Sequence, residues 1–192
     1  IEANRLLSLM WHRSPPFVSC CRIKRILVIR TDRLGEPLLH LPLVDALKRA
    51  CRDATLTWMV NPDLVELISQ APEVDRTLGY DVDPASSWWR RAVRLAGRLR
   101  REQFDLVMIS NSTKEFHLAT WLSGIPVRVG YDRKWGFLLT HRLEDRRALG
   151  DCHEVEYNIG LLTALGLTVA ASPVLHLPVT EERNTSSPSE AP

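Results

Sequence analysis

The sequence of 192 residues predicts an α/β fold, in which a parallel sheet carries helices on both faces. Short, continuous apolar runs rich in β-branched residues alternate, about five times, with segments whose apolar residues recur at helical spacing. Hydrophobic residues make up 45% of the chain and charged residues 25%. This composition supports a sizeable core and is too apolar for general disorder.

Strands are expected wherever an apolar run is short and bounded by turn residues. The strongest runs are 26–29, 55–60 and 106–109, because each is continuous and suits a strand buried on both faces. Weaker or more polar runs add further strands or extended segments. These lie at 74–78, 125–131, 138–143 and 175–178.

Helices are expected between these runs. Apolar residues recur at helical spacing over 38–47, and Asn61 followed by Pro62 is a typical start for a helix through Ile68. A further helix covers 115–122 and ends at Gly124. The last spans 152–165, with Gly166 in the position of a C-terminal cap and His153 expected to be structural.

The helix that follows Ser86 or Ser87 is strongly amphipathic. Its apolar stripe consists of Trp88, Ala92, Leu95, Ala96 and Leu99, and we expect the Trp88-Trp89 pair to lie in the core and anchor the helix. Arginines between 90 and 101 lie largely away from the stripe. They form either a solvated face or a surface for anionic lipid headgroups.

The chain divides into three parts. Residues 1–23 form an N-terminal extension whose apolar run at 6–11 is too short to span a membrane. That run could lie on a membrane surface as an amphipathic segment, or pack on the domain. Residues 24–179 form one Rossmann-like domain, and the polar residues 180–192 form a linker or a disordered tail.

Composition excludes several functional classes. No run of about 18 uncharged apolar residues exists, which excludes a transmembrane helix. The net charge of +2 gives no argument for a nucleic-acid partner. The basic residues comprise 21 arginines and only four lysines, which allows an anionic ligand, although a GC-rich genome gives the same bias.

The cysteines form neither a disulfide framework nor the CxxC spacing of a metal site. We therefore expect reduced cysteines, a cytoplasmic location and no metal. The four are Cys20, Cys21, Cys51 and Cys152.

Ligands of such sheets bind beyond the carboxyl ends of the strands, so loops 30–37, 110–114 and 130–135 are the candidate site. In the first loop, Gly35 permits a close approach of a ligand, and the next helix offers free N–H groups to an anion. The loop matches neither GxGxxG nor a Walker A motif. Glu36 could cap the helix or act as a base on a substrate hydroxyl.

The other two loops also carry polar side chains. Ser110, Asn111 and Lys114 could hydrogen-bond a sugar, although Ser112 or Thr113 could simply cap the next helix. The cations of the later segment could bind an acidic ligand or form a solvated surface. They are Arg128, Arg133 and Lys134.

Four ordered segments resemble glycosyltransferase family 9, the ADP-heptose:lipopolysaccharide heptosyltransferases. They read RILVIRTDRLGEPLLHLPLVDALKRA, FDLVMISNS, ATWLSGIPVRVGYDRKWGFLLTHRL and HEVEYNIGLLTALGL, and cover 24–178. The resemblance implies the N-terminal half of a GT-B enzyme. In that architecture the N-terminal domain receives the acceptor and the C-terminal domain holds the nucleotide-sugar donor. The sugar then moves with inversion and without a metal or another cofactor.

By this resemblance, the acidic residue of the first loop deprotonates the acceptor. That residue is Glu36, where the family usually has Asp, and Pro37 is also unusual. Thr31, Asp32 and Gly35 would shape the loop. The later cations would steer an anionic acceptor such as the lipopolysaccharide core. The donor would be ADP-heptose or another nucleotide sugar.

Nothing after Pro178 resembles the second domain, and the first residue is Ile rather than Met. By family logic we expect the donor-binding half to be missing and the chain alone to be inactive. The alternative is a non-catalytic Rossmann-like binding or interaction module. The resemblance implies a bacterial protein in the cytoplasm, with peripheral contact to the inner membrane as a further option.

Overall fold

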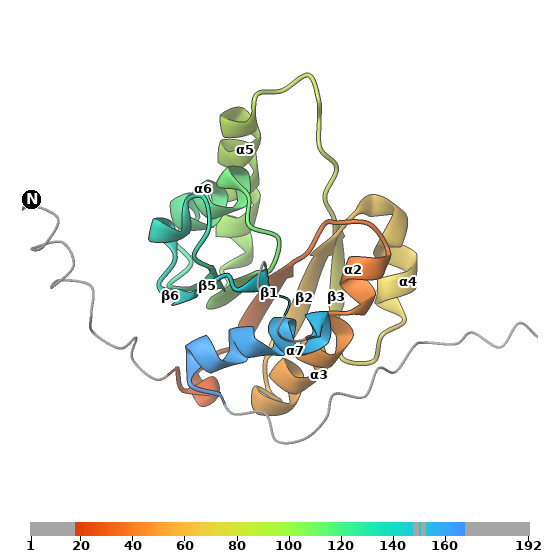
Figure 1. The fold of residues 1–192 in the computed structure, drawn as a ribbon. Helices are drawn as coiled ribbons and strands as arrows, with labels where there is room; N and C mark the ends of the chain where they lie inside the picture. Colours follow the sequence, from red (N-terminus) through yellow and green to blue (C-terminus); the bar gives the residue numbers. More distant parts are fainter. Residues whose placement is uncertain (1–17, 148–149, 151–152, 168–192) are drawn as a thin grey trace, which may run out of the picture.

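The computed structural model describes residues 18–147, 150 and 153–167. They form a six-stranded sheet in the order β3–β2–β1–β4–β5–β6, in which all neighbouring strands run parallel (Figure 1). This arrangement confirms the predicted fold class. The strands are β1 (Arg25–Ile29), β2 (Thr55–Val60), β3 (Arg76–Gly79), β4 (Leu106–Ile109), β5 (Val127–Tyr131) and β6 (His141–Leu143).

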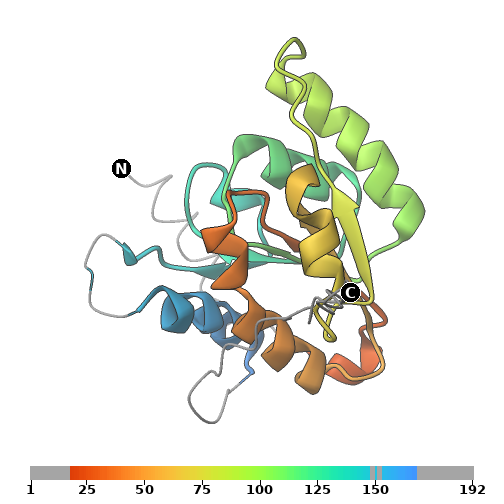
Figure 2. The ribbon, with the colours of Figure 1, turned by 90° about the vertical axis from the view of Figure 1, so that its right-hand side faces the viewer.

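The helices lie on both faces of this sheet (Figures 1 and 2). One face is covered by α3, α4, α7 and the 3₁₀ segment η5, and the other by α5 and α6. Further 3₁₀ segments are η1 (Cys20–Arg22), η2 (Pro62–Leu64) and η3 (Gly136–Leu138), with η5 at Gly160–Leu165. The helices are α2 (Gly35–Leu38), α3 (Leu41–Ala50), α4 (Val65–Ser69), α5 (Trp88–Glu102), α6 (Lys114–Leu122) and α7 (Glu154–Ile159).

Strand β1 lies at the centre of the sheet and separates two hydrophobic cores. Ile26 and Val28 point into the core beneath α3 and α7, whereas Leu27 and Ile29 point into the core beneath α5 and α6. All four are fully buried. A continuous apolar run is therefore what this strand requires, since each of its faces meets a helical layer.

The predicted helix over 38–47 is wrong in detail, because two helices occupy that region. Helix α2 ends at Leu38, a turn follows at Leu39 and His40, and α3 begins at Leu41. Pro42 explains the break. Its ring nitrogen carries no hydrogen, so it cannot donate to the carbonyl of Leu38 as a continuous helix requires.

Two further expectations are contradicted. Cys20 is paired with Cys51 as a disulfide, whereas reduced cysteines were expected. The Trp88-Trp89 pair does not lie in the core, since Trp88 is 36% and Trp89 49% exposed. The other members of the stripe, from Ala92 to Leu99, are buried as predicted. Helical periodicity alone did not reveal that the first turn of α5 extends past the sheet.

Other local predictions are confirmed. The side chain of Asn61 accepts a hydrogen bond from the backbone of Asp63, at the start of η2. Gly166 follows η5 with a φ of 76°, the left-handed conformation that glycine adopts at low cost. His153 caps α7, where its Nδ1 accepts from the Val155 N–H at 3.2 Å.

Several expectations fall on residues that the structure does not describe. They concern the apolar run at 6–11, the extended segment at 175–178 and the polar segment 180–192. Among the described residues, no helix combines the length and apolar character needed to cross a bilayer.

Two histidines are completely buried. At the α2–α3 break, His40 Nδ1 lies 3.0 Å from the Glu36 carbonyl oxygen and 3.2 Å from Asn158 Nδ2 of α7. Burial, with Arg30 nearby, lowers the pKa of His40 from 6.5 to about 3. Burial, with Lys134 nearby, lowers the pKa of His117 from 6.5 to about 4. Both rings are therefore neutral in the folded protein at pH 7.

Gly130→Ala tests the close contact between β4 and β5. An added Cβ would lie 2.9 Å from the Ile109 carbonyl oxygen and 3.2 Å from Leu139 Cδ1. We expect the free energy of unfolding, measured by urea titration, to fall by about 1–3 kcal/mol. Gly97→Ala is the control, because its Cβ meets no heavy atom within 4 Å. That change should raise stability by up to about 1 kcal/mol. Equal changes in the free energy of unfolding for the two variants would contradict this close contact at Gly130.

Stability should fall as the pH is lowered from 6.5 toward 4. Below pH 6.5 the unfolded chain takes up protons at both histidines while the folded chain does not. The stability that their neutral state provides above pH 6.5 is therefore lost on acidification. Each histidine contributes a slope of up to about 1.4 kcal/mol per pH unit.

His117→Leu isolates one of these contributions. Neither ring nitrogen of His117 has a hydrogen-bond partner among the described residues, so leucine removes polar atoms without breaking a contact. Urea unfolding between pH 4 and 7 should show a shallower pH dependence for this variant. An unchanged slope of stability against pH would contradict the contribution assigned to His117.

Candidate functional site

A crevice opens at the carboxyl ends of β1 and β4, where the strand order reverses direction. Two adjoining cavities occupy it, of about 220 and about 440 Å³. The smaller is lined mostly by polar and charged side chains, and the larger by more apolar ones, including Tyr80, Val82 and Trp88. Both cavities share Asp32, Asn111, Thr113 and Lys134.

Arg30 is a buried side chain that connects the segments around the crevice. It follows β1 directly, and its side chain is only 3% exposed. Its Nε lies 2.9 Å from Asp32 Oδ2, its Nη1 donates to the Ser110 carbonyl at 3.2 Å, and its Nη2 donates to the Glu36 carboxylate. One guanidinium therefore joins the β1 loop, α2 and the end of β4.

Arg30 orients two partly exposed carboxylates. The side chains of Asp32 and Glu36 are 41% and 45% exposed, so solvent or a ligand can reach them. Asp32 lines both cavities, whereas Glu36 lies beside Arg30 in the first turn of α2. Helix α2 has no side-chain N-cap, and the Glu36 carboxylate bonds to Arg30 instead. Glu36 is therefore paired with Arg30 rather than acting as the cap of α2, and it lines neither cavity.

Gly35 begins α2 between these two carboxylates. A Cβ at this position would meet no heavy atom within 4 Å, so open space lies in front of the loop backbone. Thr31, at the start of the same loop, accepts a hydrogen bond from Asn111 Nδ2 at 2.9 Å. The loops after β1 and β4 are thus tied across the crevice.

The loop after β4 presents unused polar atoms. Ser110 Oγ, Asn111 Oδ1 and Ser112 Oγ are buried without a hydrogen-bond partner among the described residues. Thr113, rather than Ser112, caps α6 by accepting from the Phe116 N–H at 3.1 Å. A buried polar atom is costly when unpaired, so these atoms favour a polar ligand in the cavity. Lys114 lines the larger cavity.

The three predicted cations, one within β5 and two after it, separate into two environments. Arg133 and Lys134 line the smaller cavity, where Arg133 Nη1 lies 2.8 Å from Asp145 Oδ2. Lys134 forms no ion pair within the described part of the chain, and its φ of 53° is left-handed. Arg128 lies elsewhere. Its guanidinium donates to the carbonyls of Leu138 and Ile125, and it lines neither cavity.

Sequence reasoning missed several side chains of the crevice. Arg147 stacks over Tyr131 and Tyr157, with its guanidinium carbon 4.8 Å from each ring centroid. Trp88 also lines the larger cavity and makes an edge contact with Trp135 at 5.4 Å. Arg30 could have been found, because it is the first charged residue after a buried strand. The others join the site only through packing.

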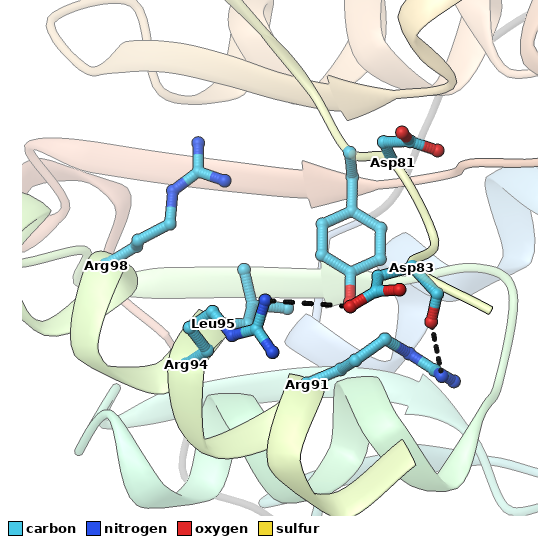
Figure 3. Close-up of a pocket in the computed structure, with 7 residues that line it drawn as sticks. Asp81, Asp83, Arg91, Arg94, Leu95 and Arg98 are labelled. Carbon is cyan, nitrogen blue, oxygen red and sulfur yellow. Dashed lines mark hydrogen bonds and ion pairs between the residues drawn. The ribbon is translucent and has the colours of Figure 1, made fainter. Parts of the chain in front are cut away.

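A buried acidic residue supports the wall of the larger cavity. Glu115 accepts a hydrogen bond from the Tyr80 hydroxyl, and Arg91 contacts it through Nε at 2.8 Å and Nη2 at 2.7 Å. Burial and the Glu115 contact raise the pKa of Tyr80. Arg91 also donates to the carbonyls of Asp83 and Ser86, which anchors the loop before α5 (Figure 3).

No cluster suited to a metal ion is found within residues 18–147, 150 and 153–167. Three carboxylates line the two cavities, from Asp32, Glu115 and Asp145, together with several cations and uncharged hydrogen-bonding groups, while Glu36 lies beside them on Arg30. Such a set can bind a polyhydroxylated, negatively charged ligand and accept a proton from one of its hydroxyls.

Comparison with known proteins agrees with the sequence resemblance. No protein-family model matches the chain. The chain is 31% identical over 142 residues to a Haemophilus influenzae protein named "Putative glycosyltransferase", a match covering 73% of this chain and 40% of that protein. It is 24% identical over 140 residues to lipopolysaccharide heptosyltransferase 3 of Escherichia coli, covering 70% and 40%.

Solved structures show the same fold. A family 9 glycosyltransferase from Veillonella parvula superposes with a TM-score of 0.71 at 21% identity, over 83% of this chain and 46% of that one. The E. coli ADP-heptose lipopolysaccharide heptosyltransferase II gives 0.63 at 24%, over 82% and 47%. In both sequence and fold, the chain therefore resembles the family 9 glycosyltransferases and the lipopolysaccharide heptosyltransferases, over less than half the length of those proteins.

Proposed function

We propose that this chain is the acceptor-binding domain of an inverting glycosyltransferase. It would transfer heptose, or a related sugar, from a nucleotide-sugar donor to a lipopolysaccharide core or similar glycan in the cytoplasm. The observation that carries the proposal is the pair of partly exposed carboxylates, Asp32 in the crevice and Glu36 beside it, that the buried Arg30 contacts. The sequence relatives, which are named as a glycosyltransferase and a heptosyltransferase, support the reaction class.

Inverting transfer needs a base beside the acceptor hydroxyl, because the hydroxyl must lose its proton as it attacks the sugar. A carboxylate can take that proton when it lies within hydrogen-bonding reach. Glu36 occupies the position that the resemblance assigns to this base. Its contact with Arg30 fixes the direction of the carboxylate, and its exposure leaves room for a substrate. Thr31, Asp32 and Gly35 shape the loop around it.

The rest of the crevice would hold the acceptor. Lys134 and Arg133 supply positive charge for an anionic group, and Lys134 has no carboxylate competing for it in the described region. Ser110 and Asn111 offer unpaired polar atoms to sugar hydroxyls, while Lys114 borders the larger cavity. Arg128 is omitted from this set, because its guanidinium is engaged by backbone carbonyls. The donor would bind to a further domain facing this crevice, as the GT-B architecture implies.

Calorimetric titration tests whether this domain binds the acceptor and leaves the donor to another domain. The purified chain should bind a deacylated lipopolysaccharide core fragment containing Kdo, and bind ADP-heptose far more weakly. Lys134→Glu should weaken acceptor binding about tenfold, because it replaces an unpaired cation in the cavity by an anion. Lys24→Glu is the matched control, because Lys24 is exposed at the start of β1. Tight donor binding would contradict the assignment of this domain to the acceptor.

Glu36→Gln tests the base in a protein that joins this chain to a family 9 donor-binding domain. We expect kcat for sugar transfer to fall about 100- to 10,000-fold, with little change in the acceptor KM. Asp32→Asn is the comparison, since both carboxylates contact Arg30 but Asp32 lines both cavities and Glu36 lines neither. A larger loss with Asp32→Asn would move the base to Asp32. Full activity of both variants would show that neither carboxylate is the base. Absence of transfer by the unsubstituted joined protein would favour a non-catalytic binding module.

A further inference from the structure

Helix α5 carries most of its positive charge on its outer side. Its 15 residues include six arginines and one glutamate, whereas the whole chain has a net charge of only +2. The helix lies along one side of the molecule, and its buried side packs on the sheet through Ala92, Leu95 and Leu99 (Figures 1 and 2). The outer side therefore concentrates positive charge at a place where nothing in the described fold covers it.

The arginines of α5 fall into two groups. Arg91 is tied to Glu115 and to backbone carbonyls, Arg94 lies 4.0 Å from Asp83, and Arg100 donates to the Leu122 carbonyl. Figure 3 shows the first two directed at Asp83, while Arg98 extends away from it. Arg90, Arg98 and Arg101 pair with no carboxylate in the part of the chain that the structure describes. Arg98 lines a separate cavity beside Asp81 and Asp83, so Arg90 and Arg101 are the two cations that the outer side leaves to an external anion.

Exposed apolar side chains accompany these cations. Trp89 and Val93 of α5 are 49% and 54% exposed, and Trp121 of α6 is 49% exposed. The guanidinium of Arg90 lies 5.2 Å from the centre of the Trp89 ring. Helices α5 and α6 pack side by side on the same face of the sheet, so their outer sides point away from it together. We define the outer face as Trp89, Arg90, Val93, Arg101 and Trp121.

We infer that this outer face docks the protein on an anionic lipid bilayer. Trp89 and Val93 are four residues apart, and Arg90 and Arg101 are eleven apart, so an apolar row and a basic row lie next to each other on the outer side of the helix. Such a helix lies in the plane of a membrane, where tryptophan occupies the headgroup boundary and arginine contacts the phosphates. A nucleic acid or an acidic protein could pair with the arginines, but neither would bury the exposed side chains of Trp89 and Val93.

The geometry relates this face to the crevice. Trp88, directly before Trp89, lines the larger cavity, so the first turn of α5 belongs to both surfaces. A protein docked through α5 would hold the mouth of the crevice close to the bilayer. Docking is measured without any transfer reaction, so the result does not depend on whether the proposed function is correct.

Vesicle sedimentation tests the inference on the purified chain. Vesicles of phosphatidylcholine with about 30% phosphatidylglycerol should bind the protein at 0.1 M salt, and pure phosphatidylcholine vesicles should bind it at least about tenfold more weakly. Raising the salt concentration should release it. Failure to bind the anionic vesicles, or equal binding to both kinds, overturns the inference.

Variants locate the binding surface. Arg90→Glu and Arg101→Glu combined should lower the partition coefficient at least about tenfold, since each arginine near an anionic surface contributes about fivefold. The matched control combines Arg22→Glu and Arg52→Glu, which changes the net charge equally at exposed positions outside α5. Equal losses in both double variants would overturn the inference.

Further variants separate the apolar contribution from the electrostatic one. Trp89→Ser with Val93→Ser should weaken vesicle binding severalfold at unchanged charge, which a purely electrostatic contact would not show. Thermal unfolding checks that each variant is folded, and the neutral combination Arg90→Gln and Arg101→Gln should bind at an intermediate level. Tighter binding of single-stranded RNA than of anionic vesicles would assign the face to a nucleic acid instead.

Discussion

The buried guanidinium of Arg30 is the interaction on which the candidate site depends. It joins Asp32, Glu36 and the Ser110 carbonyl, so one side chain connects loops about 80 residues apart in sequence. A buried cation is tolerated only when it is paired and hydrogen-bonded. The same requirement that stabilises Arg30 therefore fixes the direction of two carboxylates. The position of these carboxylates therefore follows from the need to neutralise one buried cation at the end of β1.

The sheet topology explains why this happens at a single place. Because β2 and β3 extend from one side of β1, and β4 to β6 from the other, the loops after β1 and β4 diverge and leave a crevice between them. Apolar runs fill the strands, and polar residues follow directly at their carboxyl ends. Arg30 and Ser110 are the first polar residues after β1 and β4, and both are nearly completely buried.

Helix α5 shows how one amphipathic segment can serve two surfaces. Its buried stripe covers the sheet, and Arg91 supports the crevice wall through Glu115. Its opposite side leaves Arg90 and Arg101 without a carboxylate partner among the described residues. Charge on a helix surface is ordinarily uninformative, since most of it is solvated. Here the distribution of partners separates arginines that hold the structure together from arginines that face outward.

The sequence by itself determined the strands, several caps and the family resemblance, because these depend on local patterns. Continuous apolar runs specify buried strands, and Asn61 and Gly166 act on neighbouring backbone groups. Tertiary structure alone decided the rest. The exposure of Trp89, the pairing of Cys20 with Cys51 and the role of Arg30 all depend on contacts between distant segments. Such contacts leave no periodicity in the sequence, since they arise only when the sheet brings its loops and helices together.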